Sequence, residues 1–196
     1  DEAARFASRQ EIIRRYYVAL CDLKQGKGTE EPVRKLELLM RKANVTARER
    51  RVVEPALSLA EETDETAAAM ELPDGRIVTG KTSDLLGASS ALLLNALKAL
   101  GDIPREVHLI SPQAIDPIQH LKVDHLGNRN PRLHTDETLI ALSISAATNP
   151  VAEQAMEQLS KLRGCEVHSS VILTAVDENV FKRLGVNLTC EPRYKG

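Results

Sequence analysis

Residues 167–190 read VHSSVILTAVDENVFKRLGVNLTC, and this stretch decides the fold. Residues 167–173 are apolar enough to form a buried strand, and Thr174 is a typical residue to cap a helix. Phe181 and Leu184 continue that helix, Gly185 ends it, and residues 186–190 have the composition of a second strand. Two strands joined by one short helix predict a β-α-β unit with parallel strands and a right-handed crossover.

Upstream of this unit, residues 68–72 and 76–79 flank Pro73-Asp74-Gly75. Asp-Gly accepts the positive φ of a tight turn, so these residues predict a β-hairpin. Between the hairpin and the β-α-β unit we expect a helix over 89–100 ended by Gly101, a short buried strand over 107–110, and a helix over 115–126. Thr135 is expected to cap a helix beginning at Asp136, and a further helix is expected over 151–162.

The first 65 residues have the pattern of helices. Capping-box sequences begin at Ser8 and Thr46, and a helix beginning near Thr29 is expected to bury Val33, Leu36, Leu39 and Met40. A third helix contains Pro55, which should kink or split it. The sequence therefore predicts a mixed α/β (α+β) fold with two parts: a helical subdomain over 1–65 and a three-layer α/β/α sandwich over 66–196.

Composition excludes several functions. The chain has 196 residues, a net charge of −2 and 3% aromatic residues with no Trp. A balanced charge and so few aromatic rings argue against nucleic acid as a partner. No apolar run is long enough to cross a bilayer, and no signal peptide is present, so we expect a cytoplasmic protein without a membrane partner. Because the chain does not begin with Met, we also expect it to be part of something longer.

The residue types that commonly bind metals, cysteine and histidine, do not form a recognisable metal site in this sequence. Three cysteines stand far apart with no CxxC pair, which is typical of free thiols in a reducing compartment. His120 and Asp124 share a helix face, but no zinc-protease motif accompanies them. The sequence predicts no metal site and no cofactor.

Residues 75–82 read GRIVTGKT and fit the phosphate-binding loop G-x-x-x-x-G-K-[ST]. That loop must wrap around a phosphate, whereas residues 76–79 have the composition of a strand. We therefore interpret the match as a coincidental hairpin.

Two groups of residues are candidates for chemistry. Lys81, Thr82 and Ser83 join a strand to a helix, where backbone N–H groups favour an anion; ordinary helix capping is the alternative. Arg132, His134 and Asp136 lie on a polar loop that enters an apolar helix, and His134 could act as an acid or base near neutral pH. The alternative is that Asp136 caps the helix and Arg132 pairs with it.

Four segments of the chain resemble the C-terminal part of a bacterial family known as domain of unknown function 1846. They are residues 10–17 (QEIIRRYY), 72–83 (LPDGRIVTGKTS), 130–137 (NPRLHTDE) and 185–192 (GVNLTCEP). The resemblance covers essentially the whole chain. It implies a larger protein whose N-terminal half is a partner of this part, and it supplies no catalytic residues.

The resemblance also implies an architecture similar to the cytidine-deaminase-like sandwich. Deaminases carry a zinc ligand followed by Glu where this chain has residues 86–91 (LGASSA), and P-C-x-x-C where it has Pro112 followed by QAID. The zinc site is therefore absent from the sequence.

The function expected from the sequence is ligand binding or assembly within a larger bacterial protein, as a homo-oligomer with an unidentified small-molecule ligand. The alternative is an enzyme, a hydrolase or group transferase, that acts on a small anionic substrate and is linked to nucleotide chemistry through the missing N-terminal half.

Overall fold

The computed structural model describes residues 1–195 and contains one four-stranded sheet with the strand order β2-β1-β3-β4. The strands are β1 (Ala67–Glu71), β2 (Ile77–Lys81), β3 (Glu166–Ser169) and β4 (Asn187–Cys190). β1 is antiparallel to both β2 and β3, while β3 and β4 are parallel. The predicted hairpin and the predicted parallel β-α-β unit are therefore both confirmed.

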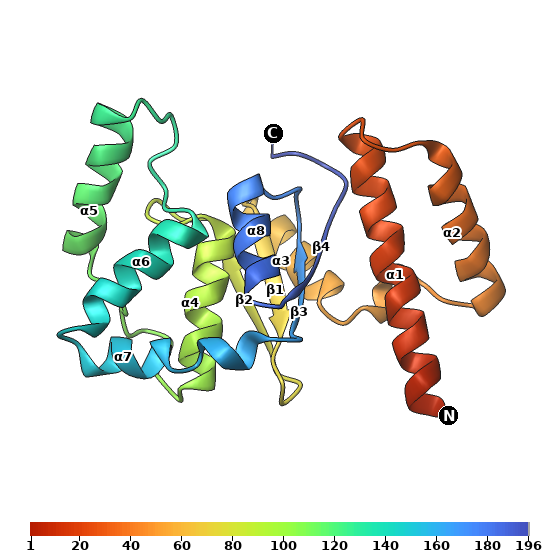
Figure 1. Cartoon of the computed structure of the whole chain (residues 1–196), viewed down its shortest axis with the longest axis horizontal. Helices are drawn as coiled ribbons and strands as arrows, with labels where there is room; N and C mark the ends of the chain where they lie inside the picture. The colour runs from red at the N-terminus through yellow and green to blue at the C-terminus, as the bar shows by residue number, and fades with distance from the viewer. Residues whose placement is uncertain (196) are drawn as a thin grey trace.

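The helices are α1 (Glu2–Lys24), α2 (Glu30–Ala43), α3 (Val53–Thr63), α4 (Ala88–Leu100), α5 (Pro112–His120), α6 (Thr135–Ala146), α7 (Pro150–Met156) and α8 (Ala175–Arg183). Short helical turns cover Ala47–Glu49, Leu121–His125 and Leu159–Leu162. Figure 1 shows the sheet near the centre, with α4, α6 and α7 to one side and α1 and α2 to the other.

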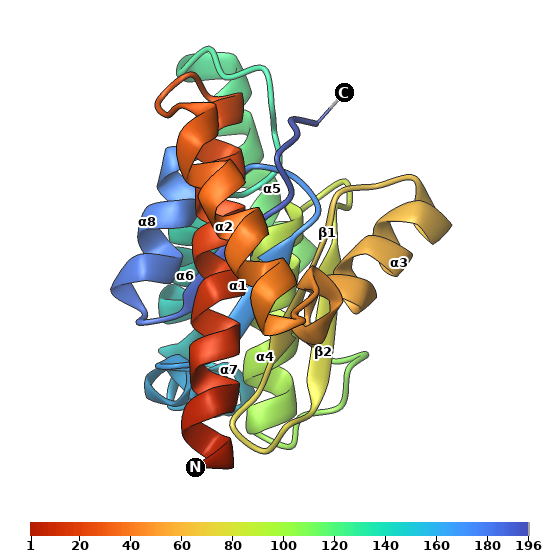
Figure 2. The same ribbon diagram turned by 90° about the vertical axis from the view of Figure 1, so that its right-hand side faces the viewer.

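Alternation along the strands assigns the helices to two faces of the sheet. Ala68, Met70 and Val167 belong to the main core with α4, α6, α7 and Phe181 of α8. Ala69 and His168 are cross-strand partners and so share the opposite face, where Ala69 packs on Val52 and Ala56 and His168 on Tyr17. The predicted mixed α/β fold is thus confirmed, with helices on both faces of the sheet. One of the two helical layers is made by α1 and α3, which were predicted to lie in a separate subdomain; Figure 2 shows α3 and α4 on opposite sides of β1 and β2.

The predicted boundary between residues 65 and 66 stays a prediction. α3, which lies before that boundary, packs against β1, β2 and β3. The similarity to the cytidine-deaminase-like sandwich also stays a prediction.

The predicted strand over 107–110 is wrong. These residues form bends, and the carbonyls of Arg105 and Val107 accept hydrogen bonds from the Lys98 ammonium in place of a neighbouring strand. Leu109 and Ile110 are buried, as a strand there would have been. The apolar residues over 107–110 therefore reflect burial in the core and not a strand.

Several helix boundaries also differ from prediction. α1 begins at Glu2, and the Asp1 side chain caps it, so Ser8 lies inside the helix. Leu39 of α2 is 44% exposed and Leu36 only half-buried, since α2 packs mainly against α1 and its buried residues are Val33 and Met40. Pro55 falls in the first turn of α3, where its missing N–H costs little, and does not kink it.

Two further corrections concern the elements around the candidate site. The strand predicted over 167–173 ends at Ser169, and residues 170–174 form a loop. The expected cap of α6, Thr135, is the first residue of the helix, and His134 occupies the N-cap position. The Thr135 hydroxyl instead donates to Asp177.

Candidate functional site

A cavity of about 170 Å³ lies beyond the end of β3, where the loop over 170–174 meets the starts of three helices. Parallel strands commonly place a ligand site at their carboxyl ends, because the connecting loops splay apart there. The cavity is lined by Thr66, Thr82, Gly87, Ala88, Ser89, Asn130, Arg132, Leu133, His134, Val171, Ile172, Leu173, Thr174, Asp177 and Lys195. We call it the helix-start cavity.

Three helices begin at this cavity. The N-cap residues of α4, α6 and α8 are Gly87, His134 and Thr174, and all three line it. Each helix start carries partial positive charge, and at α6 and α8 part of it is already used, because the N–H groups of Thr135 and Asp177 donate to Asp177 Oδ1 and Thr174 Oγ1. Three such starts around one small space favour a negatively charged ligand.

Two hydroxyl groups line the cavity without a partner. Thr82 is 6% exposed and Ser89 is 3% exposed. Neither side chain makes a hydrogen bond to any other residue in the range 1–195. The residues are buried, but their hydroxyl oxygens are not among the fully buried side-chain atoms that lack a partner, which within residues 1–195 are Thr138 Oγ1 and Gln158 Oε1. Both hydroxyls are therefore available to a ligand in the cavity.

His134 and Asp177 form the ionisable pair of the cavity. His134 Nδ1 lies 3.6 Å from Asp177 Oδ2, while Asp177 Oδ1 accepts from the Thr135 N–H at 2.9 Å and from its hydroxyl at 2.7 Å. The nearby Asp177 carboxylate raises the pKa of His134. Burial works to raise the pKa of Asp177, but the nearby His134 ring and the hydrogen bonds from Thr135 outweigh burial and lower it.

Two cationic side chains border the same cavity. Arg132 Nε donates to the Ser83 carbonyl at 2.6 Å, which fixes the loop over 130–134 beside the end of β2. Lys195 Nζ lies 3.6 Å from Glu65 Oε2. Their charges add to the positive potential of the helix starts.

The structure brings together only some of the residues expected from the sequence. Thr82, Arg132 and His134 line the helix-start cavity, but Lys81, Ser83 and Asp136 do not. Lys81 is exposed at the end of β2, and the Ser83 hydroxyl accepts from the N–H groups of Leu85 and Leu86. Asp136 is exposed in the first turn of α6, and Arg132 makes no ion pair with it within residues 1–195.

Six polar lining residues were not among the candidates from the sequence: Thr66, Ser89, Asn130, Thr174, Asp177 and Lys195. Asp177 had one local signal, because Thr174-x-x-Asp177 is a helix-start pattern of the capping-box type, and Thr174 does cap α8 by accepting from the Asp177 N–H. No local signal pairs Asp177 with a residue 42 positions earlier.

The interpretation of residues 75–82 as a hairpin is confirmed. Gly75 lies in the turn with φ +86°, and Leu72 donates its N–H to the Arg76 carbonyl. Gly80 lies within β2 directly under α4, where a Cβ would come within 2.6 Å of Leu92 Cα. Its role is close packing of strand and helix, not contact with a phosphate.

His120 and Asp124 form an exposed pair 2.8 Å apart, away from the helix-start cavity. Among residues 1–195 no three His, Cys, Asp or Glu side chains are grouped as a metal ion would need. In the same part of the chain, no helix combines the length and apolar character that crossing a membrane requires.

Comparison with known proteins identifies close relatives. A UPF0371 protein of Corynebacterium glutamicum (strain R) is 52% identical over 195 residues, covering 100% of this chain and 39% of the relative. UPF0371 proteins of Streptococcus pneumoniae (strain CGSP14) and Streptococcus thermophilus are 53% and 52% identical, with 40% of each relative covered. The chain thus spans about 40% of the length of the curated relatives it matches.

Two family models match the chain. The model described as domain of unknown function DUF1846, C-terminal, matches residues 48–196, and the N-terminal DUF1846 model matches residues 1–44. The expectation that the chain lies wholly in the C-terminal part is therefore corrected, because α1 and α2 match the N-terminal model. The chain belongs to the DUF1846 family.

Proposed function

We propose that this chain is a ligand-binding part of a larger bacterial protein and holds a small anion, such as a phosphate or carboxylate group, in the helix-start cavity. The observation that carries the proposal is the convergence of three helix starts on a space lined by two nearly buried residues, Thr82 and Ser89, whose hydroxyls make no hydrogen bond within residues 1–195. Thr82 and Ser89 would donate to the anion, and Arg132, Lys195 and protonated His134 would balance its charge.

Calorimetric titration of the chain with inorganic phosphate tests the proposal. The double variant Thr82→Val with Ser89→Ala removes two hydrogen bonds to a charged group, so we expect it to weaken binding by at least about 10-fold. Thr148→Val, at an exposed position outside the cavity, is the matched control and should bind as the parent does. Equal affinity in the parent chain and the double variant would contradict the proposal.

The pairing of His134 with Asp177 supports a second candidate, an enzyme. In this case the protein is a hydrolase or group transferase for a small anionic substrate, with His134 as proton donor and Asp177 holding its ring. Turnover of p-nitrophenyl phosphate that disappears in His134→Gln, in a variant that still binds phosphate, would favour the enzyme. Binding without turnover in the parent chain would favour the ligand-binding function.

We also propose partners for the whole protein. The rest of the longer chain is expected to pack beside α1 and α2, since these helices match the N-terminal family model. We further propose that the whole protein is a homo-oligomer in the cytoplasm and that neither nucleic acid nor a membrane is its partner. A measurement of molecular mass in solution tests the oligomer, and a monomer at high concentration would exclude it.

A further inference from the structure

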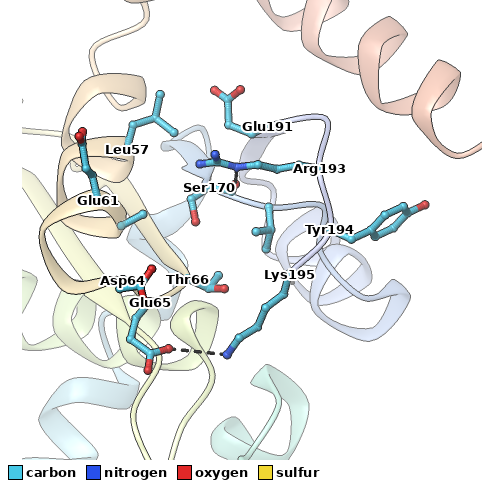
Figure 3. A pocket seen from close by; sticks show the side chains of 12 residues that line it. Leu57, Glu61, Asp64, Glu65, Thr66, Ser170, Glu191, Arg193, Tyr194 and Lys195 are labelled. Carbon is cyan, nitrogen blue, oxygen red and sulfur yellow. Dashed lines mark hydrogen bonds and ion pairs between the residues drawn. The ribbon is translucent and has the colours of Figure 1, made fainter.

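A second and larger cavity adjoins the helix-start cavity. It has a volume of about 750 Å³ and lies between the end of α3 and the segment over 191–195 that follows β4. Figure 3 shows its two walls: Glu61, Asp64 and Glu65 lie on the α3 side, and Arg193 and Lys195 extend toward them from the other. Acidic and basic side chains thus face one another across it.

The two cavities share part of their lining. Thr66, Val171 and Lys195 line both of them, so the cavities adjoin at these three residues, where we infer that one ligand extends from one to the other. The Thr66 carbonyl accepts from the Thr82 N–H at 2.9 Å, which keeps this junction beside the two unpartnered hydroxyls. Lys195 lies at the junction, held by its ion pair with Glu65 (Figure 3).

The helix-start cavity and the larger cavity differ in size and therefore suit different chemical groups of a ligand. A phosphate group has five heavy atoms and needs on the order of 150 Å³, given about 30 Å³ for each water-sized volume. The helix-start cavity therefore has room for one such group and little else. The larger cavity is wide enough for an organic group of sugar size joined to it.

The walls of the larger cavity favour hydroxyl groups. A hydroxyl can donate to a carboxylate and accept from a guanidinium or ammonium group, so it suits a space with acids on the α3 side and with Glu191, Arg193 and Lys195 on the other. A second anionic group would meet the three acids of α3 and its following residues, and an alkyl chain would leave these charged groups without partners.

We propose that the ligand is a hydroxyl-rich organic phosphate of the sugar-phosphate class. Its phosphate group lies at Thr82 and Ser89, and its hydroxyl-bearing part lies between the α3 acids and Arg193. This inference rests on the proposed function, since it needs an anion in the helix-start cavity.

The test is a calorimetric comparison of three probes on the 196-residue chain: inorganic phosphate, glucose 6-phosphate and n-hexyl phosphate. We expect glucose 6-phosphate to bind at least about 10-fold more tightly than the other two. The double variant Glu61→Gln with Asp64→Asn, which leaves the Glu65–Lys195 ion pair in place, should reduce that preference and leave the affinity for phosphate unchanged. Glu62→Gln, exposed on the same helix and outside the cavity, is the matched control.

The outcomes separate this inference from the proposed function. A chain that binds phosphate but prefers neither organic probe, or that prefers hexyl phosphate, overturns the inference alone. A preference for glucose 6-phosphate that survives in the Glu61 and Asp64 double variant also overturns it. A chain that binds none of the three probes overturns the proposed function and the inference with it.

Discussion

Arg50 is the charged residue most deeply placed in this fold. Its side chain is 1% exposed, and its guanidinium donates to Glu166 Oε2 at 2.6 Å, to the Thr189 hydroxyl at 2.8 Å and to the carbonyls of Val167 and Asn187 at 2.9 Å. These partners lie on β3 and β4. One side chain from the segment before α3 therefore ties both parallel strands to the helical layer.

Arg50→Met should lower the free energy of unfolding by about 3 kcal/mol, because it leaves several buried acceptors without a donor. Arg51→Met is the matched control: this neighbouring side chain is 54% exposed in its ion pair with Glu71, and its loss should cost less than about 1 kcal/mol. Urea unfolding of both variants measures the difference. Equal shifts of the two midpoints would contradict the role assigned to Arg50.

His134 gives the stability a pH dependence. Its pKa is raised above the ordinary value of 6.5 by the nearby Asp177 carboxylate, so its contribution is present in full below pH 6.5 and is lost as the pH rises through the raised pKa. The parent chain should exceed His134→Gln in stability by more at about pH 5.5 than at about pH 8.5. Urea titrations at both pH values measure this, and His125→Gln, which removes an exposed imidazole, is the control. A comparable pH dependence in the control would contradict the prediction.

Residue-level chemistry also explains why only three of the six candidate residues from the sequence line the helix-start cavity. Thr82, Arg132 and His134 stand where a strand ends or a helix begins, and sequence patterns detect such positions. Asp136 is only two residues beyond His134, but that places it on an exposed part of the first helical turn. Ser89 lies in a run of small residues with no polar pattern to mark it, and tertiary packing alone brings it to the cavity.

At the scale of elements, the hairpin and the helix after it are held together by the close approach of β2 and α4. The Asp-Gly turn made the hairpin predictable, because its conformational requirement is local. The need for glycine at position 80 could not be predicted from the local sequence, since the contact that excludes a side chain there is with the backbone of Leu92. The predicted strand over 107–110 failed for the same reason: an apolar run specifies burial, and the neighbouring element decides whether a strand forms.

Gly80→Ala should cost at least roughly 3 kcal/mol or prevent folding, because its Cβ would lie 2.6 Å from Leu92 Cα and 2.9 Å from the Ala91 carbonyl carbon. Gly87→Ala, at the start of the same helix, has its nearest contact at 3.7 Å and should cost less than about 1 kcal/mol. Thermal unfolding followed by circular dichroism compares the two. A Gly80→Ala variant as stable as Gly87→Ala would show that α4 can move away from β2.

At the scale of the whole molecule, the first 44 residues help to cover one face of the sheet. The Tyr17 ring lies 4.8 Å from the ring of His168, which is fully buried, and Arg14 bonds Glu166 at 2.8 Å. The mixed α/β fold was predictable from the β-α-β unit and the hairpin. The sharing of one sheet face by α1 and α3 was not, because hydrophobic periodicity shows that a helix has an apolar face but not what that face covers.

A fragment of residues 48–196 should therefore unfold at a lower urea concentration than the whole chain, since removing α1 uncovers His168 and its neighbours. Residues 66–196, which also lack α3, should show no cooperative transition, because Ala69 then loses Val52 and Ala56 as well. Urea titration of the two fragments and the whole chain measures this. If residues 66–196 unfold cooperatively with the stability of the whole chain, the boundary predicted between residues 65 and 66 is a true domain boundary.

The contact between Tyr17 and His168 also means that tyrosine fluorescence can report on the packing of α1 against the sheet. The chain has three tyrosines and no Trp, so its ultraviolet emission comes from tyrosine alone. Tyr16 and Tyr17 lie on α1, while Tyr194 borders the larger cavity. A Tyr194→Phe variant would emit from α1 only, and its fluorescence would follow that helix leaving the sheet without any attached dye.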